Sequence, residues 1–187
     1  MNFNTKKLLC YNSTHMNHPT STLSYDNKNF LLTWIKDSKL KDYNPINQVY
    51  GIVFNDKGEI LIAREKLEDK WAIPGGKPEA GENIEETLRR ELVEEVDVSV
   101  SKVLPLGAQK VELDGDSDGK SISYQLRCIA LLKELLPQTP DPAHGSTWER
   151  RFVPAEDINK YIKWGELGTM MFKDAIDLFR IFQIPID

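Results

Sequence analysis

Three glutamates, spaced as on one face of a helix, follow a glycine-rich loop in this chain. The loop reads Gly75-Gly76-Lys77-Pro78-Glu79-Ala80-Gly81-Glu82, and the run Arg90-Glu91-Leu92-Val93-Glu94-Glu95 comes shortly after it. On a helix, Glu91, Glu94 and Glu95 occupy positions i, i+3 and i+4 and project from the same side. Carboxylates that close repel one another unless a cation lies between them, and such oxygen ligands hold Mg²⁺ at phosphates. The spacing therefore suggests metal-assisted chemistry at a phosphate.

A capped, amphipathic helix must position these carboxylates. Asn83 has the capping-box spacing to Glu86, which predicts that the helix begins there. An aliphatic residue then recurs at every fourth position, which gives the helix a buried stripe: Ile84, Leu88, Leu92 and Val96. The glutamates lie beside this stripe, and the valines that follow lead the chain into a strand.

Strand and turn patterns surround the loop and the helix. Residues 48–54 and 59–64 are predicted strands joined by a turn with the sequence Asn55-Asp56-Lys57-Gly58. Further strands are predicted at 108–113, 122–132 and 148–153, and two closing helices at 155–162 and 166–182. Strands on both sides of a central helix, with a helix at the end, imply an α/β layered sandwich around a mixed sheet.

The first 45 residues are predicted to be an N-terminal extension of a domain over 46–187. Asn44-Pro45 marks the boundary, and residues 1–25 carry no hydrophobic periodicity, which is typical of a flexible leader. A helix over 27–40 is predicted by an N-cap at Asp26 and by the spacing of the apolar residues after it. The stretch 29–35 could equally be a strand, which would either cover the core or contribute to a dimer interface.

Composition and charge favour a soluble enzyme. Of 187 residues, 40% are hydrophobic and 28% charged, which is ordinary for a globular protein. The net charge of −5 argues against a nucleic-acid-binding surface. No apolar run has the length of a signal peptide or a membrane span. The two cysteines, Cys10 and Cys128, are expected to be reduced. We therefore expect a cytoplasmic enzyme with no membrane partner.

The loop and the helix together resemble the Nudix box. The spacing is Gly76, five residues, Glu82, seven residues, and then Arg90-Glu91-Leu92-x-Glu94-Glu95-x-Asp97-Val98. The family pattern has glycine where this chain has Asp97, at a helix exit that often needs a left-handed conformation, which Asp tolerates better than most residues. The box covers residues 76–98, and the order of elements from about 46 to 182 is also similar to the family fold, an α/β/α sandwich around a mixed β-sheet.

The resemblance implies a Nudix hydrolase. Such enzymes cleave a nucleoside diphosphate linked to a further group by attack of water at phosphorus, with Mg²⁺ as the cofactor and Mn²⁺ as the alternative. The residues expected to act in catalysis are Glu91, Glu94 and Arg90, and those expected to contact metal are Gly75, Gly76, Glu82, Glu91, Glu94, Glu95 and Glu149. Glu91 would also orient or deprotonate the water, and a carbonyl of the glycine pair would add a ligand.

Several roles stay open at this point. Glu82 is either an outer metal ligand or an acid favoured by the helix start, and Arg90 is expected to hold the loop and the carboxylates in place. The rivals of Glu149 as an acid from outside the box are Glu112, Asp114, Asp116 and Asp118.

The substrate is not determined by the sequence. Residues 112–117 carry neither the proline that marks ADP-ribose hydrolases nor the tyrosine that marks dinucleoside polyphosphate hydrolases. The expected partner is a small-molecule nucleoside diphosphate derivative, and a homodimer stays open. The alternative function is a Nudix-fold binding or regulatory module without turnover, against which the retained Arg90 and glutamates speak.

Overall fold

A single mixed β-sheet organises the chain. The computed structural model describes residues 18–65, 70–113, 115, 121–143 and 145–183. The strands are β1 (Thr20–Tyr25), β2 (Lys28–Lys36), β3 (Ile46–Phe54), β4 (Glu59–Arg64), β5 (Gly75–Gly76), β6 (Val98–Leu113), β7 (Ser123–Leu135) and β8 (Glu149–Pro154). Their order is β1-β2-β6-β7-β3-β4-β8, with β5 paired to β3. β3 and β7 are parallel, and the other pairs are antiparallel.

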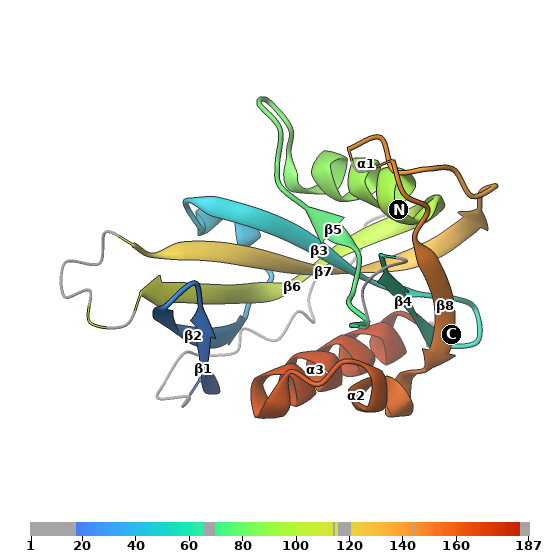
Figure 1. Ribbon diagram of the computed structural model, residues 1–187. Coiled ribbons are helices and arrows are strands. Elements are labelled where there is room, and N and C mark those ends of the chain that lie inside the picture. The colour runs from blue at the N-terminus through green and yellow to red at the C-terminus, as the bar shows by residue number, and fades with distance from the viewer. Residues whose placement is uncertain (1–17, 66–69, 114, 116–120, 144, 184–187) are drawn as a thin grey trace, which may run out of the picture.

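Helices cover both faces of this sheet (Figure 1). Helix α1 (Ile84–Val96) lies on one face, and α3 (Gly165–Gln183) lies on the other beside the short α2 (Ile158–Tyr161). Two 3₁₀ turns complete the elements, η1 (Leu40–Asp42) and η2 (Ala155–Asp157). The predicted α/β/α sandwich around a mixed sheet is confirmed.

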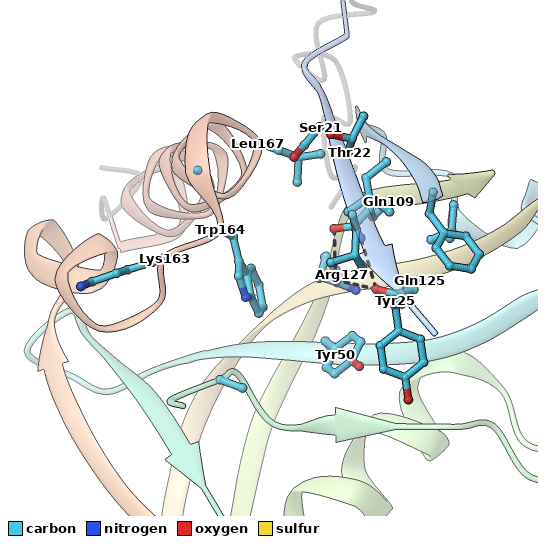
Figure 2. A pocket seen from close by; sticks show the side chains of 16 residues that line it. Ser21, Thr22, Tyr25, Tyr50, Gln109, Gln125, Arg127, Lys163, Trp164 and Leu167 are labelled. Atoms are coloured by element: carbon cyan, nitrogen blue, oxygen red, sulfur yellow. Dashed lines mark hydrogen bonds between the residues drawn. The ribbon is translucent and has the colours of Figure 1, made fainter. Parts of the chain in front are cut away.

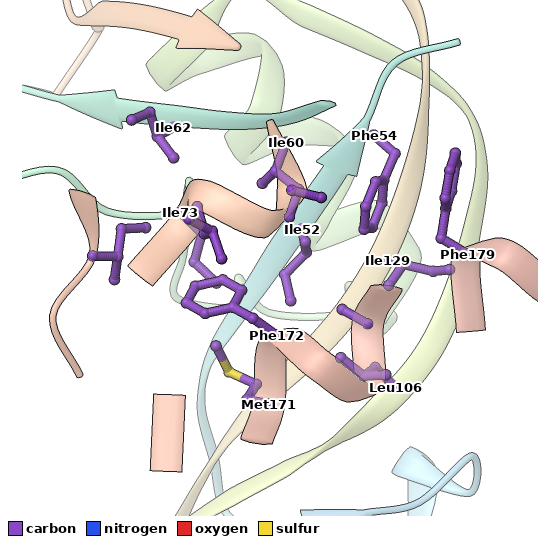
Figure 3. Packing of buried hydrophobic residues seen from close by; sticks show 14 of the residues in the cluster. Ile52, Phe54, Ile60, Ile62, Ile73, Leu106, Ile129, Met171, Phe172 and Phe179 are labelled. Atoms are coloured by element: carbon purple, nitrogen blue, oxygen red, sulfur yellow. The ribbon is translucent and has the colours of Figure 1, made fainter. Parts of the chain in front are cut away.

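The alternation of residues along β3 creates two hydrophobic cores. Ile52 and Phe54 point into the core under α3, whereas Val49 and Val53 point into the core under α1, because successive side chains of a strand face opposite sides. Figure 3 shows the α3 core, where the Phe54 ring stacks on that of Phe179 with 4.2 Å between their centroids. The middle strands are therefore buried on both faces, and they form a rigid support for the segments above them.

The helix predicted over 27–40 is wrong, and the alternative strand is right. This segment is β2, which pairs with β1 on one side and with β6 on the other. Asp26 and Asn27 do not cap a helix; both have positive φ (49° and 57°) and make the tight turn of a β1–β2 hairpin. Trp34 is 1% exposed in the α3 core, so the strand covers the core. Of the predicted flexible leader over residues 1–25, residues 1–17 lie outside the described part of the chain. The prediction is wrong for Thr20–Tyr25, which form strand β1 because they pair with β2. The domain boundary at 45 stays a prediction.

The predicted strand at 108–113 is only the end of a longer one. β6 runs from Val98 to Leu113, but its pairing with β7 shifts register between Ser99 and Val100, between Val100 and Lys102, and between Pro105 and Gly107. Each shift interrupts the alternation of side chains, so the sequence pattern breaks where the strand continues. The predicted helix at 155–162 likewise begins as η2 before it becomes α2.

A buried polar contact fastens β2 to α3. The indole Nε1 of Trp34 donates to Oδ2 of Asp174 at 2.8 Å, and Nζ of Lys36 donates to Oδ1 of the same carboxylate at 2.8 Å. Asp174 is itself 9% exposed. A buried donor without an acceptor is costly. The contact between the β1–β2 hairpin and α3 therefore depends on the carboxylate of Asp174.

Replacing Asp174 should therefore weaken the fold. Asp174→Ala leaves the Trp34 N–H without an acceptor, and we expect urea denaturation to show a loss of about 1–3 kcal/mol in the free energy of unfolding. Asp174→Asn is the matched control: it keeps an acceptor and loses only the ion pair to the half-exposed Lys36, worth up to about 1 kcal/mol. An alanine variant as stable as the wild type would contradict this account.

Candidate functional site

The start of α1 is set by the predicted capping box. Oδ1 of Asn83 accepts from the backbone N–H groups of Glu85 and Glu86 at 2.9 and 3.0 Å, and Oε2 of Glu86 accepts from Asn83 N–H at 2.8 Å. The capping box is thus confirmed. It fixes the point at which the glycine-rich loop becomes helix, and with it the direction of every side chain further along.

The buried stripe presses α1 onto β3. Leu88, Leu92 and Val96 are fully buried in the α1 core, and Ile84 is partly buried at its edge. A Cβ atom on Gly51 of β3 would lie only 2.9 Å from Cδ1 of Leu88. The missing side chain at Gly51 therefore lets the helix approach the sheet closely, and the glutamates beside the stripe come to rest against the loop.

Arg90 is the centre of the charged cluster. Its Nε and Nη2 donate to Glu82 at 2.7 and 3.0 Å, and its Nη1 donates to Glu91 and to Glu94, both at 3.0 Å. Nη2 also donates to the carbonyl of Lys77 in the loop at 3.0 Å. One planar guanidinium, with donors in a fixed fork, thus ties the loop to Glu91 and Glu94, two of the glutamates predicted to bind metal.

Glu82 holds the end of the loop. Besides Arg90, its carboxylate accepts from the backbone N–H of Glu79 and from the hydroxyl of Thr87, both at 2.9 Å. The hydrogen bonds from Arg90, above all, lower the pKa of Glu82 to about 2. These contacts are those of an acid that joins the loop to the first turns of α1, and a role as outer metal ligand stays a prediction.

Glu95 and the glycine pair lie on the other side of the cluster. Oε2 of Glu95 accepts from the backbone N–H of Gly75 at 2.9 Å. Gly75 has φ +141° and faces Tyr50 of β3, where a Cβ atom would lie 2.2 Å from the carbonyl of Val49. A Cβ atom on Gly76 would lie 2.4 Å from Oε1 of Glu91. Only glycines fit this close approach of the loop to the carboxylates.

The carboxylates repel one another at this site. Burial, together with the charges of Glu91, Asp141 and Glu94, raises the pKa of Glu95 to about 8 from its ordinary 4.5. Burial is also the main cause of the raised pKa of Glu91, to which Glu94 and Glu82 contribute. The negative charge concentrated here exceeds what Arg90 offsets, and an added cation would lower the electrostatic cost.

The donor set fits a hard divalent cation. Three carboxylates next to a glycine backbone offer the oxygen ligands that Mg²⁺ and Mn²⁺ bind. Over the described part of the chain, no group of three Asp, Glu, His or Cys side chains is already gathered in a metal-binding arrangement. The reason is visible in the contacts, since Arg90 takes one oxygen each of Glu91 and Glu94. A bound metal would have to compete with the guanidinium for these oxygens.

Glu149 is not brought to this cluster. Glu149 begins β8, where it pairs with Arg64 of β4. Its Oε2 accepts two hydrogen bonds from Arg64, at 2.6 and 2.8 Å, and its Oε1 accepts one from Arg151 at 3.4 Å. Those two arginines also lie over the ring of Trp71. Of the rivals, Glu112 pairs with Lys110 at 2.7 Å, and Asp114, Asp116 and Asp118 lie outside the described residues.

Asp141 is the acid that sequence reasoning missed. It is 4% exposed, and its charge is among those that raise the pKa of Glu95. Trp148 Nε1 donates to it at 3.0 Å and the N–H of Ala143 at 2.7 Å, which fixes the carboxylate in its loop. The sequence feature that could have indicated this aspartate is its position between two prolines, which restrict the backbone on both sides of it.

Asp97 ends α1 in the left-handed conformation expected for this position, with φ 48° and ψ 50°. Its side chain, 4% exposed, accepts from the N–H and the hydroxyl of Thr139 at 3.1 and 2.6 Å. Arg150 donates to the carbonyls of Val96, Asp97 and Leu136 from the neighbouring strand β8. The carboxylate therefore contributes contacts that a glycine could not make.

Comparisons with known proteins agree on one family. Residues 45–171 match the family model of the NUDIX domain. The chain is 48% identical over 59 residues to an RNA pyrophosphohydrolase of Halorhodospira halophila (strain DSM 244 / SL1), a match that covers 32% of this chain and 33% of that protein. It is 33% identical over 78 residues to nucleoside diphosphate-linked moiety X motif 6 of Xenopus laevis, a match that covers 38% of this chain and 36% of that protein. The matched stretches thus span about a third of the length of these curated relatives.

Solved structures resemble this fold over most of the chain. A structure from work on MutT of Aliivibrio salmonicida and Vibrio cholerae superposes with a TM-score of 0.50 at 26% identity, covering 72% of this chain and 98% of that one. The pyrophosphohydrolase BsRppH of Bacillus subtilis, as its E68A mutant, superposes with a TM-score of 0.61 at 18% identity, covering 83% and 94%. The second likeness concerns the fold alone.

The raised pKa of Glu95 predicts a pH-dependent stability. Because the folded pKa (about 8) exceeds the ordinary 4.5, its contribution to stability is complete below pH 4.5 and is lost as the pH rises through 8. In EDTA, Glu95→Gln should therefore melt at a higher temperature than the wild type at pH 8.5, with a smaller difference at pH 5. Adding Mg²⁺ at pH 8.5 should raise the melting temperature of the wild type only. A difference independent of pH would refute the assignment.

The contacts of Asp97 predict that the glycine of the family pattern would be worse here. Asp97→Gly relieves a left-handed residue, worth about 1–2 kcal/mol, but removes two buried hydrogen bonds to a charged group, worth about 1.5–3 kcal/mol each. We expect a net loss of at least about 1 kcal/mol in urea denaturation. Asp97→Asn, which keeps one acceptor, should lose less. A glycine variant more stable than the wild type would show that the contacts to Thr139 contribute little.

Proposed function

We propose that this chain, which belongs to the Nudix family, is a metal-dependent hydrolase that cleaves the phosphoanhydride bond of a nucleoside diphosphate derivative. The proposal depends on the close packing of Glu91, Glu94 and Glu95 against the glycine-rich loop. At Gly75 and Gly76 no residue larger than glycine would fit beside the carboxylates and β3. Burial raises the pKa of Glu91 and of Glu95, so these groups are poorly stabilised by the protein alone. The named relatives and the family match support the same reaction class.

Each residue of the cluster has a part in this proposal. Glu91, Glu94 and Glu95 would hold Mg²⁺, with Mn²⁺ as the alternative, and the ion would neutralise phosphate oxygens and acidify a bound water. Glu91, which lies against Gly76, would also orient the attacking water or take its proton. Gly75 N–H orients Glu95, and Arg90 keeps Glu91 and Glu94 from swinging away from the loop.

The reaction would transfer one phosphoryl group to water. Water forms a new P–O bond, and the bond between phosphorus and the bridging oxygen breaks. The products are a nucleotide and the phosphorylated remainder of the substrate. A small-molecule substrate fits the acidic chain, which has a net charge of −5. No helix in the described part of the chain is long and apolar enough to cross a membrane. A cytoplasmic location is proposed from the cysteine content alone.

A phosphate-release assay over a panel of nucleoside triphosphates and nucleotide sugars tests the proposal. We expect turnover that requires a divalent metal and a loss of about 100-fold or more in kcat for Glu94→Gln and Glu95→Gln, because each removes a charged ligand of an ion that contributes several kcal/mol. Circular dichroism should show the folds to be intact.

Glu85→Gln is the matched control. Glu85 lies on the same helix, but it pairs with Arg89 and its side chain is 53% exposed. The Glu85→Gln variant should therefore hydrolyse substrate as fast as the wild type. Unchanged activity in both site variants would remove the metal assignment. Tight nucleotide binding without turnover of any substrate would favour a regulatory module.

A further inference from the structure

A pocket of about 580 Å³ lies beside the cluster, on the α3 side of the sheet. This is the volume of a small-molecule site. Its walls come from the β1–β2 hairpin, from the middle strands β3, β6 and β7, and from the segment that leads into α3. The hairpin precedes residues 45–171, so part of the wall lies outside the stretch that matches the family.

The floor of the pocket holds a buried cation. Arg127 of β7 is 2% exposed, and its Nε has no hydrogen-bond partner. Its other donors reach only neutral oxygens: Leu126 O at 3.2 Å, Gln125 Oε1 at 3.0 Å and Gln109 Oε1 at 3.4 Å. Figure 2 shows these three side chains, Arg127, Gln109 and Gln125, joined at one end of the pocket.

Within the described part of the chain, no acidic side chain compensates the charge of this guanidinium. Burial lowers the pKa of Arg127 to about 10, so it stays protonated at neutral pH. No carboxylate among the described residues pairs with it, and the residues that line the pocket include no Asp or Glu. Lys163 is the other charged residue of the lining, and Figure 2 shows its nitrogen turned away from Arg127. A buried charge without a partner is costly, which indicates that a ligand completes the site.

Aromatic rings offset part of this cost. Cζ of Arg127 lies 4.3 Å from the centre of the Tyr50 ring and 5.9 Å from that of the Trp164 ring. Such contacts hold a guanidinium in place without neutralising its charge. Nε is enclosed by protein and has no hydrogen-bond partner, so an anion in the pocket would compensate the charge of the whole group rather than bind this atom.

Tyr50 also connects the pocket to the charged cluster. On β3 it pairs with Gly75, whose N–H donates to Glu95. The chain of direct contacts is therefore Glu95, Gly75, Tyr50 and Arg127. A substrate whose diphosphate lies at the glutamates would extend past Tyr50 to reach the guanidinium.

We propose that this pocket binds an anionic group, phosphate or carboxylate, on the part of the substrate beyond the diphosphate, and that Arg127 selects for it. The inference rests on the proposed function and narrows its substrates to those whose linked group carries a charge of its own. Recognition of a nucleobase is the competing use of a guanidinium and glutamines. The missing counter-charge favours the anion, because a neutral base would leave the buried charge uncompensated.

The first experiment measures anion binding without metal, so that the glutamate cluster takes no part. In EDTA, inorganic phosphate should raise the melting temperature of the wild type above that in chloride of equal ionic strength. Glu95→Gln should respond in the same way, and Arg127→Met should not. Without phosphate, Arg127→Met should melt at or above the wild-type temperature, since it removes an uncompensated buried charge. If this variant does not fold, Arg127→Gln replaces it, with the same expectation for phosphate.

The second experiment asks whether that anion belongs to the substrate. Kinetics with a nucleoside triphosphate, whose linked group is a phosphate, are compared with those of a nucleotide sugar, whose linked group is neutral. Arg127→Met should raise KM for the triphosphate by about 10- to 100-fold, the value of hydrogen bonds to one charged group, with a much smaller effect on kcat. The KM for the nucleotide sugar should change far less.

Three outcomes would overturn the inference. They are an equal phosphate response in Arg127→Met, equal losses of kcat/KM with both substrates, and a loss that follows the identity of the base. A free phosphate that binds through Arg127 without affecting substrate preference would likewise remove the substrate assignment. Failure of the proposed function looks different, since it would appear as absence of hydrolysis in the wild type while the metal-free binding persists.

Discussion

The guanidinium of Arg90 is the contact on which the site depends. Without it, Glu82, Glu91 and Glu94 would concentrate negative charge along one side of α1, and the loop carbonyl of Lys77 would lose its donor. Because the donors of arginine lie in one plane, the group fixes directions as well as charge. The loop and α1 therefore act as one unit that is rigid before any ligand arrives. Arg90 does not pair with Glu95, which accepts a hydrogen bond from the backbone N–H of Gly75 instead; among the described residues this is its one hydrogen bond.

The sheet supplies the support for this unit. β3 is buried on both faces, and two consecutive residues of this strand serve the two faces differently. Gly51 lets α1 settle onto the strand, while Tyr50 faces the other side and forms a wall of the pocket. The acidic cluster beside α1 and the basic pocket beside α3 are thus both built on strand β3, which holds them at a fixed distance from each other.

The local parts of the site could be predicted from the sequence, and the non-local parts could not. The capping box, the stripe on α1 and the left-handed Asp97 depend on residues a few positions apart, so their pattern is complete in the sequence. The sequence leaves the β2 segment open between helix and strand and predicts no strand at β1, because pairing with β6, far along the chain, decides the structure of this hairpin. The sequence does not single out Asp141 for a similar reason: its charge acts on Glu95, 46 positions earlier, only because the fold brings the two segments together.

The position of the hairpin in the chain has a consequence for how substrate range can diverge. The proposed metal-binding cluster is encoded between residues 75 and 95, whereas the first wall of the pocket is encoded before residue 37. The hairpin joins the sheet through one flank, by pairing with β6, and through the Trp34–Asp174 contact. The proposed metal site and this wall of the pocket are thus encoded in separate segments, whereas Arg127 lies on β7 in the middle of the sheet. Exchange of one edge hairpin between homologues would reshape the pocket around Arg127 without altering a proposed metal ligand.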